Sequence, residues 1–307
     1  MNEAIHYPVA LTIAGSDSGG CAGIQADLKT FSAIGVFGTS VITAITAQNT
    51  QEVRAIEILS PSIIRQQLEA TLDDIPAKAT KIGMLPSPEI VEVVAEIIDR
   101  YRLKNVVLDP VMVSTSGARL TSALTTDAFR QELYRRATII TPNVPEAEAL
   151  SGVTIRTEKD FRKAAEALLN QGCHAVLIKG GHLSSDCSVD MLFQQSGEPF
   201  SLVSPRLSTA NLHGAGCTLS SAIVAYRARG LTWARALDMA KNYVNFAILY
   251  GGDVTTGKGR GPLNHFFNPQ PLEGVQEAPP KPKSKPKSKS NAKPKPKPNA
   301  KPKSNDI

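Results

Sequence analysis

YPVALTIAGSDSGGCAGIQADLKTFSAI, residues 7–34, decides the fold class, because three local patterns follow one another in it. Residues 7–14 form an apolar run of strand length, which is typical of a strand buried on both faces. Residues 15–20 are rich in glycine and serine and predict a loop. Residues 22–34 predict a helix. A strand, a glycine-rich loop and a helix in this order indicate the beginning of a βαβ unit.

The same alternation continues along the chain. Strands are expected at residues 39–47, 53–59, 79–84, 105–108, 137–140 and 175–178, with a more exposed, antiparallel pair at 189–194 and 200–203. Helices are expected at residues 60–73, 87–101, 125–135, 145–150, 158–170, 218–229 and 232–250. Alternating strands and helices predict an α/β protein whose mostly parallel central sheet is covered by helices on both faces, which is a three-layer α/β/α arrangement.

Polar residues gather at the carboxyl ends of the expected strands, where open parallel sheets bind their ligands. Six strand ends share this feature: Gly15-Ser16-Asp17, Gln48-Asn49, Gly83-Met84, Asp109, Thr141 with Asn143 and Glu146, and Lys179-Gly180-Gly181. One polar strand end would carry little information. Six at the same edge of one sheet predict a single active-site rim.

A second glycine-rich turn, HGAGCTLS at residues 213–220, leads directly into a helical pattern. Backbone N–H groups and the helix dipole make such a turn a good site for an anion, above all a phosphate. Cys217 lies in this turn, and a helix N-terminus lowers the pKa of a thiol, so some thiolate is expected near neutral pH. A turn that only opens a helix has about the same prior, because short Gly-x-Gly matches are common.

Oxygen ligands and a lysine follow three of the strands. Asp109, Asn143 and Glu146 are of the type that Mg²⁺ shares with substrate phosphates, and Lys179 is expected to approach a nucleotide phosphate. The alternatives are a carboxylate that stabilises the first turn of a helix for Glu146 and a solvated lysine for Lys179. The sequence contains neither a Walker motif nor a Rossmann glycine fingerprint after the first strand, so another phosphate-binding architecture is required.

These motifs together resemble the ribokinase-like superfamily, and more closely the hydroxymethylpyrimidine kinase/phosphomethylpyrimidine kinase family of thiamine biosynthesis. The resemblance runs from about residue 9 to residue 266. It is carried by eight motifs in order: LTIAGSDSGGCAGIQADLKT (11–30), VITAITAQNT (41–50), KIGMLPS (81–87), NVVLDPVM (105–112), ITPNVPEAEAL (140–150), VLIKGGH (176–182), HGAGCTLSSA (213–222) and GKGRGPLNHF (257–266).

The resemblance implies a Mg²⁺- and ATP-dependent kinase that phosphorylates 4-amino-5-hydroxymethyl-2-methylpyrimidine and then its monophosphate. It implies that the turn from Gly214 through Ala215 and Gly216 to Cys217 is the anion hole, with Cys217 where related sugar kinases carry an aspartate base. Ala215 departs from the family pattern, in which Gly or Thr is frequent there, but it keeps its N–H group.

The remaining roles also come from the resemblance. Gln48 is expected to read the pyrimidine, because its amide can both donate and accept hydrogen bonds. The other expected contacts are Asp27, Gly15 and Met84 for the substrate, Lys179, His213 and Lys258 for ATP, and Asp109, Asn143 and Glu146 for Mg²⁺. A structural role for His213, as the residue before a helix, is equally expected.

Two alternatives stay open. One is a pyridoxal-type vitamin kinase of the same branch, since pyridoxal is also a flat heteroaromatic ring with a hydroxymethyl arm. The other is a binder of pyrimidines or vitamins, or a nucleic-acid protein that acts through its C-terminal tail. The complete rim speaks against a pure binder, because such a protein needs no metal site.

The formal net charge of +6 arises from the C-terminus. Residues 280–307 hold ten lysines and one acid, whereas the preceding residues hold 24 basic and 27 acidic ones. We therefore expect a kinase domain at residues 1–270 and a disordered, Lys/Pro/Ser-rich tail at 271–307. The tail is expected to be an unselected, solvated extension, with non-specific contact to polyanions as the alternative.

Composition also bears on the cellular compartment. No apolar run reaches the length needed to span a bilayer, and the N-terminus does not read as a signal peptide. The four cysteines show no Cys-x-x-Cys spacing and suggest neither a disulfide framework nor a zinc site. A cytoplasmic enzyme without membrane contact is expected, and a homodimer is left open.

Overall fold

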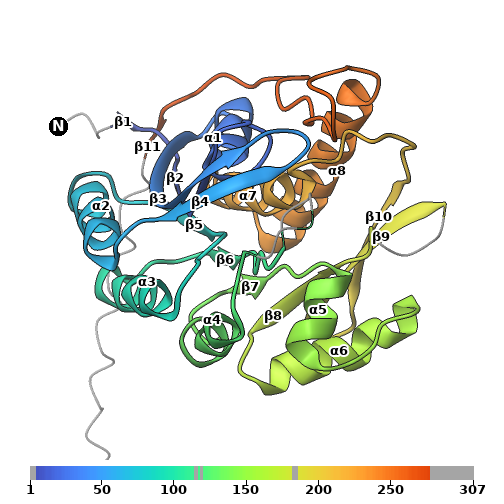
Figure 1. Ribbon diagram of the computed structural model, residues 1–307, viewed down its shortest axis with the longest axis horizontal. Helices are drawn as coiled ribbons and strands as arrows, with labels where there is room; N and C mark the ends of the chain where they lie inside the picture. Colours follow the sequence, from blue (N-terminus) through green and yellow to red (C-terminus); the bar gives the residue numbers. More distant parts are fainter. Residues whose placement is uncertain (1–4, 114–116, 118–119, 182–185, 277–307) are drawn as a thin grey trace, which may run out of the picture.

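A nine-stranded sheet forms the centre of the computed structural model, which describes residues 5–113, 117, 120–181 and 186–276 (Figure 1). Its strands are β2 (Val9–Asp17), β3 (Phe37–Gln48), β4 (Val53–Ile58), β5 (Ala79–Ile82), β6 (Val106–Leu108), β7 (Ile139–Ile140), β8 (Ala175–Lys179), β9 (Cys187–Gln194) and β10 (Phe200–Pro205). They are ordered β10-β9-β8-β7-β6-β5-β2-β3-β4. The strands from β8 to β3 are parallel, and β4, β9 and β10 pair antiparallel, as expected for the exposed pair.

Helices cover both faces of the sheet, which confirms the three-layer α/β/α arrangement (Figure 1). One face carries α1 (Gly23–Ala33), α7 (Ala215–Ala228) and α8 (Trp233–Gly251). The other carries α2 (Pro61–Asp74), α3 (Pro88–Tyr101), α4 (Ala123–Ala128), the π-helical turn η1 (Phe129–Leu133), α5 (Val144–Ser151) and α6 (Glu158–Asn170). Each helical layer shares its own hydrophobic core with the sheet.

The helix expected at residues 125–135 differs from a regular α-helix. It begins as α4 and widens into η1, where the Tyr134 N–H donates to the Phe129 carbonyl oxygen five residues earlier, at 3.1 Å. A five-residue turn places Phe129 and Tyr134 on the same side of the helix. Both side chains are fully buried there, so the widened turn adds a second large aromatic ring to the core.

The order of the strands creates a switch point between β2 and β5. From β2 the chain proceeds outward through β3 to β4, and it then returns to place β5 on the other side of β2. Ligands of open α/β sheets bind outside the carboxyl ends of the strands at such a point. The helix α7 packs against β2, β5 and β6, so its N-terminus belongs to the same region.

The C-terminal segment returns to the amino edge of the sheet. β1 (Ile5–His6) pairs antiparallel with β11 (Val275–Gln276), and the Gln270 N–H donates to the Ala33 carbonyl oxygen at 2.8 Å. A side chain at Gly35 would lie 2.5 Å from the Pro271 carbonyl oxygen, so the segment is closely packed. Contact with the domain thus continues six residues past the expected boundary at residue 270, to Gln276. The rest of the expected tail lies outside the described residues.

Among the residues that the structure describes, every helix is too short or too polar to cross a lipid bilayer.

Two truncations separate the packed part of the C-terminus from the rest. Deletion of residues 277–307 is expected to leave the melting temperature unchanged. Deletion of residues 271–307 removes β11 and the contact at Gly35, and we expect a loss of about 1 kcal/mol, or roughly 2–4 °C. Thermal unfolding of both proteins measures the difference, and equal melting temperatures would show that residues 271–276 add no stability.

Candidate active site

The two glycine-rich loops of the sequence lie against each other. Gly214 has a φ of +84°, and a Cβ atom there would come within 1.9 Å of the Cys21 carbonyl oxygen. Only glycine meets both conditions, because an L side chain is strained at this φ and would clash with the facing backbone. The loop after β2 and the turn before α7 are therefore held in direct backbone contact.

Asp17 organises the first of these loops. Its carboxylate accepts hydrogen bonds from the backbone N–H groups of Gly19, Cys21 and Ala22 at 2.8, 3.0 and 2.8 Å. The side chain is 3% exposed, so these bonds are shielded from water. Sequence reasoning placed Asp17 on the rim without a role, and the structure shows that it shapes the loop on which Gly214 packs.

The first turn of α7 is the accessible part of this assembly. Gly214 is its N-cap, and Ala215, Gly216 and Cys217 form the first turn, where backbone N–H groups lack partners within the helix. These three residues are half-buried, whereas Thr218 and the following turn are buried. The Ala215 N–H donates to the Leu212 carbonyl oxygen at 3.2 Å, which leaves Gly216 and Cys217 as the donors that this helix N-terminus can offer to an anion.

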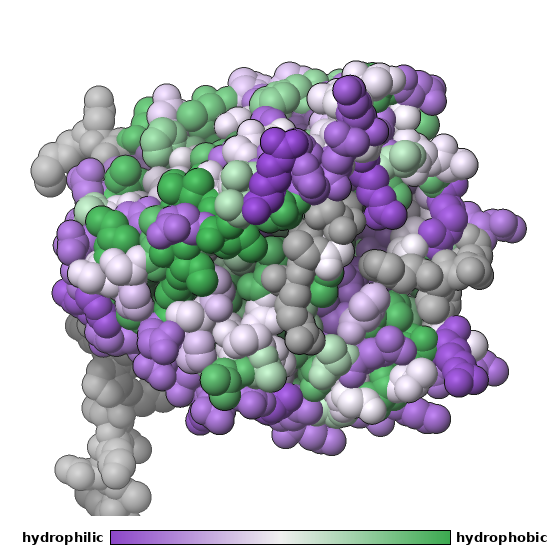
Figure 2. Space-filling view, viewed as in Figure 1, coloured by the Kyte–Doolittle hydropathy of each residue, from purple (hydrophilic) through white to green (hydrophobic). Residues whose placement is uncertain are grey.

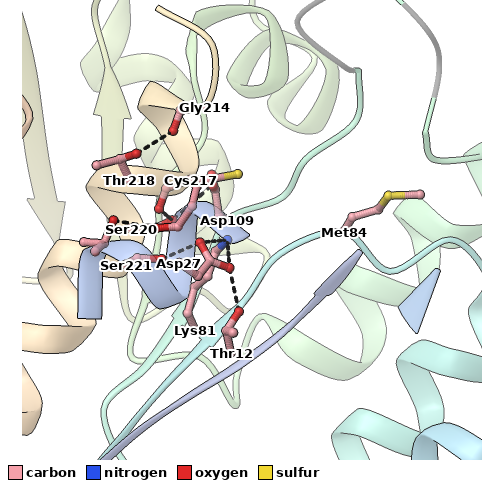
Figure 3. Close-up of polar contacts among 12 residues, drawn as sticks. Thr12, Asp27, Lys81, Met84, Asp109, Gly214, Cys217, Thr218, Ser220 and Ser221 are labelled. Atoms are coloured by element: carbon pink, nitrogen blue, oxygen red, sulfur yellow. Dashed lines mark hydrogen bonds and ion pairs between the residues drawn. The ribbon is translucent and has the colours of Figure 1, made fainter. Parts of the chain in front are cut away.

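A buried charged cluster lies next to this turn (Figure 3). The Lys81 ammonium donates to both oxygens of Asp27 at 2.8 Å, and Thr12 and Ser221 donate to the same carboxylate at 2.6 and 2.5 Å. Burial lowers the pKa of Lys81, but the charge of Asp27 outweighs it and holds the pKa above its usual value. Lys81 is therefore charged, and the Asp27 carboxylate has hydrogen-bond partners for both oxygens.

Asp27 does not line an open pocket, contrary to the expectation from sequence. Its side chain and that of Lys81 are fully buried, and its oxygens are bonded to protein groups. The physical reason is that Lys81, in the middle of β5, donates to both oxygens of Asp27. Asp27 can therefore affect a substrate only through its neighbours.

Cys217 also differs from expectation. Burial raises the pKa of its thiol, and the opposing effects of Lys81 and of a hydrogen bond from the Gly23 backbone do not compensate. The carboxylates of Asp27 and Asp109 raise the pKa further. The helix N-terminus was expected to lower it, but two buried acids and the loss of solvent outweigh that effect. Cys217 is thus a neutral thiol at pH 7 in the free protein.

Asp109 and Lys179 form a second buried ion pair, at the ends of β6 and β8. The Lys179 ammonium lies 2.7 Å from Asp109 Oδ1 and 3.9 Å from Glu146 Oε2. Ser220 of α7 donates to Asp109 Oδ2 at 3.1 Å, which links the pair to the second turn of α7. Burial raises the pKa of Asp109, but Lys179 and Lys81 outweigh it and hold the pKa below its usual value.

Asn143 and Glu146 form a capping box at the start of α5. The Glu146 N–H donates to Asn143 Oδ1 at 2.9 Å, and the Asn143 N–H donates to Glu146 Oε2 at 2.8 Å. Glu146 therefore does stabilise the first turn of a helix, which was the alternative to a metal ligand. Its second carboxylate oxygen takes no part in the capping box. Burial raises the pKa of Glu146 to about 7, against the opposing charge of Lys179.

The acidic residues fit a shared magnesium ion better than a protein-only metal site. Among the described residues, no group of three His, Cys, Asp or Glu side chains could hold a metal alone. The Lys179 ammonium lies within 4 Å of both Asp109 and Glu146. Mg²⁺ commonly takes one or two carboxylates together with water and substrate phosphates, which this arrangement allows.

The expected pyrimidine contacts gather at the ends of β2 and β3. Gly15 and Met84 are adjacent, since a Cβ atom on Gly15 would lie 3.1 Å from the Met84 sulfur. The Gln48 amide nitrogen lies 3.2 Å from His213 Nε2. The end of β3 is thereby joined to the residue that precedes the anion-binding turn.

His213 and the segment that carries Lys258 lie at the end of β3, and their expected contact with ATP stays a prediction. Gly257 and Gly259, which flank Lys258, pack on Thr50 just after β3, and the Arg260 N–H donates to the Thr50 carbonyl oxygen at 3.0 Å. The glycines between residues 257 and 261 cause this placement, because only a backbone without side chains can approach Thr50 so closely.

Lys81 and Ser221 were missed at the sequence level. Lys81 stands in a four-residue strand whose positions are all buried. A charged residue within such a short run signals a buried partner, and this signal was available. Ser221 offered no such signal, because a serine in a helix is usually exposed.

Residues 17–264 match the family described as phosphomethylpyrimidine kinase. The chain is 46% identical over 258 residues to the hydroxymethylpyrimidine/phosphomethylpyrimidine kinase of Escherichia coli (strain K12), which covers 84% of this chain and 97% of that protein.

Solved structures of kinases also resemble this chain. The crystal structure of phosphomethylpyrimidine kinase from Clostridium difficile superposes with a TM-score of 0.69 at 47% identity, over 78% of this chain and 99% of that one. An ADP complex of Bacillus subtilis pyridoxal kinase superposes with a TM-score of 0.78 at 38% identity, over 85% of this chain and 98% of that one.

The raised pKa of Cys217 predicts how this thiol reacts. The thiolate is the nucleophile, so alkylation of Cys217 should be slow at pH 7 and keep accelerating about tenfold per pH unit to beyond pH 9. The rate can be followed by mass spectrometry in a Cys187→Ser background, because Cys187 is the exposed thiol. A rate that levels off below pH 8 would mean that the site stabilises the thiolate.

Proposed function

The chain belongs to the phosphomethylpyrimidine kinase family, and we propose that it transfers the γ-phosphoryl group of ATP to 4-amino-5-hydroxymethyl-2-methylpyrimidine and then to the monophosphate so formed. Its fold is the ribokinase-like fold of the kinases with which it superposes. The observation that carries the proposal is the half-buried first turn of α7, which follows His213 beside Gln48 and has Lys179 Nζ 3.4 Å from a Cβ placed on Gly216.

The arrangement of the rim supports separate binding regions for the pyrimidine and for the nucleotide along the sheet. The pyrimidine would bind at the ends of β2 and β3, against Gly15, Met84 and Gln48. The nucleotide phosphates would approach Lys179 at the end of β8. The transferred group would then pass over this turn, where the N–H groups of Gly216 and Cys217 would neutralise its charge. Phosphoryl transfer relies mainly on such positioning and charge neutralisation.

Mg²⁺ would be held on the nucleotide side by Asp109 and Glu146, with Asn143 keeping Glu146 in place through the capping box. When bound, the ion would neutralise the charge on the phosphates. Lys179 already lies between the two carboxylates and would share them with the ion.

Cys217 would hold the hydroxymethyl oxygen of the substrate in line with the phosphoryl group. Because burial raises its pKa, the thiol is protonated in the free protein, and this supports positioning over proton removal. On this basis Cys217→Ala should lose about tenfold in kcat, which is less than the roughly 10²–10⁴-fold that a general base contributes.

Pyridoxal is the second candidate substrate. The structure of the Bacillus subtilis pyridoxal kinase, an enzyme named for that reaction, superposes with a higher TM-score than the phosphomethylpyrimidine kinase from Clostridium difficile. The higher sequence identity to the phosphomethylpyrimidine kinase favours the pyrimidine.

We further propose that the protein is a cytoplasmic homodimer. The four cysteines, all of which the structure describes, are not joined by disulfide bonds, as is usual in a reducing compartment. Strand β4 is an edge of the sheet, and Ile45, Ile58 and Ile63 are 48%, 49% and 41% exposed. Figure 2 shows a hydrophobic area where Figure 1 places β3, β4 and α2. An apolar edge of this kind is typical of a subunit interface, and light scattering measures the subunit number.

Mass analysis of products tests the function directly. The protein is incubated with Mg²⁺, ATP and either the hydroxymethylpyrimidine or pyridoxal. We expect the pyrimidine monophosphate first and the diphosphate later, with slower conversion of pyridoxal. Absence of both pyrimidine products would overturn the proposal.

Gly216→Pro tests the anion-binding turn. Proline is tolerated in the first turn of a helix, so the protein should fold, but one N–H donor is lost. Such a loss typically costs about 2.7–4 kcal/mol of transition-state stabilisation, so kcat should fall at least 100-fold. Binding of the pyrimidine, measured by calorimetry, should change little. An unchanged kcat in the folded variant would remove residues 215–217 from catalysis.

Glu146→Gln tests the magnesium assignment. The amide can still accept the hydrogen bond from the Asn143 N–H, so the capping box is preserved, while the negative charge is lost. The Mg²⁺ concentration for half-maximal activity should rise several-fold, with the KM for the pyrimidine unaffected. Identical Mg²⁺ titrations of both proteins would rule out a role for Glu146 at the metal.

A further inference from the structure

The amide of Gln48 is held on both sides. Its Oε1 lies 3.2 Å from the Thr46 hydroxyl, and its Nε2 lies 3.2 Å from His213 Nε2. Each amide atom keeps one further hydrogen-bonding position, since the oxygen has two lone pairs and the nitrogen two protons. Gln48 therefore offers a substrate one donor and one acceptor. Which of the two positions holds the donor depends on the orientation of the amide, and this arrangement is called its order below.

Thr46 does not determine this order. Its hydroxyl can donate to an amide oxygen or accept from an amide nitrogen, and its proton has an alternative acceptor in the Ser16 carbonyl oxygen at 3.0 Å. The ring of His213 does determine it. An Nε2 lone pair requires the amide nitrogen of Gln48 opposite it, whereas an Nε2 proton requires the amide oxygen.

His213 Nε2 faces the amide nitrogen of Gln48, and this contact requires a lone pair on Nε2. The residue is 4% exposed, and burial lowers its pKa, so the ring is neutral at pH 7. Its Nδ1 atom is buried and has no hydrogen-bond partner among the described residues. With Nε2 facing the Gln48 amide nitrogen, the single proton of the neutral ring belongs on Nδ1.

The backbone fixes the ring in this position. The His213 N–H donates to the Gly261 carbonyl oxygen at 3.2 Å, and the Gly261 N–H donates to Asn211 Oδ1 at 3.1 Å. The segment that carries Arg260 is itself bound to Thr50. Gln48, His213 and the segment of residues 257–261 thus form one assembly at the end of β3.

We infer that His213 is a specificity-determining positioning residue, which orients the Gln48 amide so that the enzyme prefers a 4-aminopyrimidine to the corresponding 4-oxopyrimidine. The inference rests on the proposed function. A 4-aminopyrimidine presents a donor at the amino group and an acceptor at ring N3. The 4-oxo compound presents the reverse, an acceptor at the oxygen and a donor at N3–H. A fixed amide matches one of the two patterns and opposes the other.

Competition between the two substrates tests the inference. The ratio of kcat/KM for 4-amino-5-hydroxymethyl-2-methylpyrimidine to that for its 4-oxo analogue is measured in the unmodified protein and in His213→Phe. Phenylalanine keeps the ring but offers no lone pair, so the amide can turn over, and the ratio should fall at least about tenfold. A ratio that stays the same while both kcat/KM values fall together would overturn the inference.

Two further variants serve as controls. Thr46→Val removes the other contact of the Gln48 amide, but His213 still fixes the orientation of that amide. Both kcat/KM values should therefore fall, while their ratio changes by no more than about twofold. In a Gln48→Leu background, His213→Phe should not change the ratio further, because the effect passes through Gln48. A further drop in that background would mean that His213 acts on the substrate independently. If the unmodified protein phosphorylates neither pyrimidine, the proposed function itself fails.

A measurement on the unmodified protein covers the case in which His213→Phe does not fold. The ¹⁵N spectrum of histidine-labelled protein distinguishes the two neutral tautomers, and the chain has only five histidines to assign. We expect the Nδ1–H form at His213 near pH 7. An Nε2–H form would reverse the order of the amide and overturn the inference.

Discussion

The ion pair between Asp27 and Lys81 is the interaction on which the geometry of the site depends. It joins α1 to β5 at the switch point of the sheet, and Thr12 and Ser221 bring β2 and α7 to the same carboxylate. Removal of one partner would leave an unpaired charge in the core, at a typical cost of about 3–5 kcal/mol. The pair therefore requires α1 and α7 to keep their positions over the sheet, and those positions set the contact between Cys21 and Gly214.

A second buried pair, Asp109 with Lys179, repeats this principle farther along the sheet. Ser220 connects it to α7, and Ser221, the next residue in that helix, connects to the first pair. Two neighbouring serines thus link α7 to both buried carboxylates, Asp109 and Asp27. The anion-binding turn, one helical turn away, is positioned with respect to both.

The order of strands and helices could be predicted from the sequence because parallel strands leave long apolar runs with polar residues at one end. The same reasoning located Gln48, Asp109 and Lys179 on one rim. It could not predict which side chains meet. Gln48 and His213 are 165 residues apart in the sequence, and Lys81 and Asp27 are 54 apart. It also expected a lowered pKa for Cys217, because the burial that raises this pKa, and the acids that add to it, come from other elements of the fold. The π-helical turn at Phe129 escaped prediction because the pattern of apolar residues there is compatible with a regular helix.

The pairing of β1 with β11 holds the two ends of the described chain at the edge of the sheet opposite the rim. Both ends of the described chain, Ile5 and Gln276, lie together near the positions where β2 and β3 begin, whereas the rim lies where the strands end. β2 alone spans nine residues, or about 30 Å, between the two edges. That distance is several times the range over which charges act through physiological salt. A charge attached directly at Ile5 or Gln276 would therefore begin beyond the range at which it is felt at the rim.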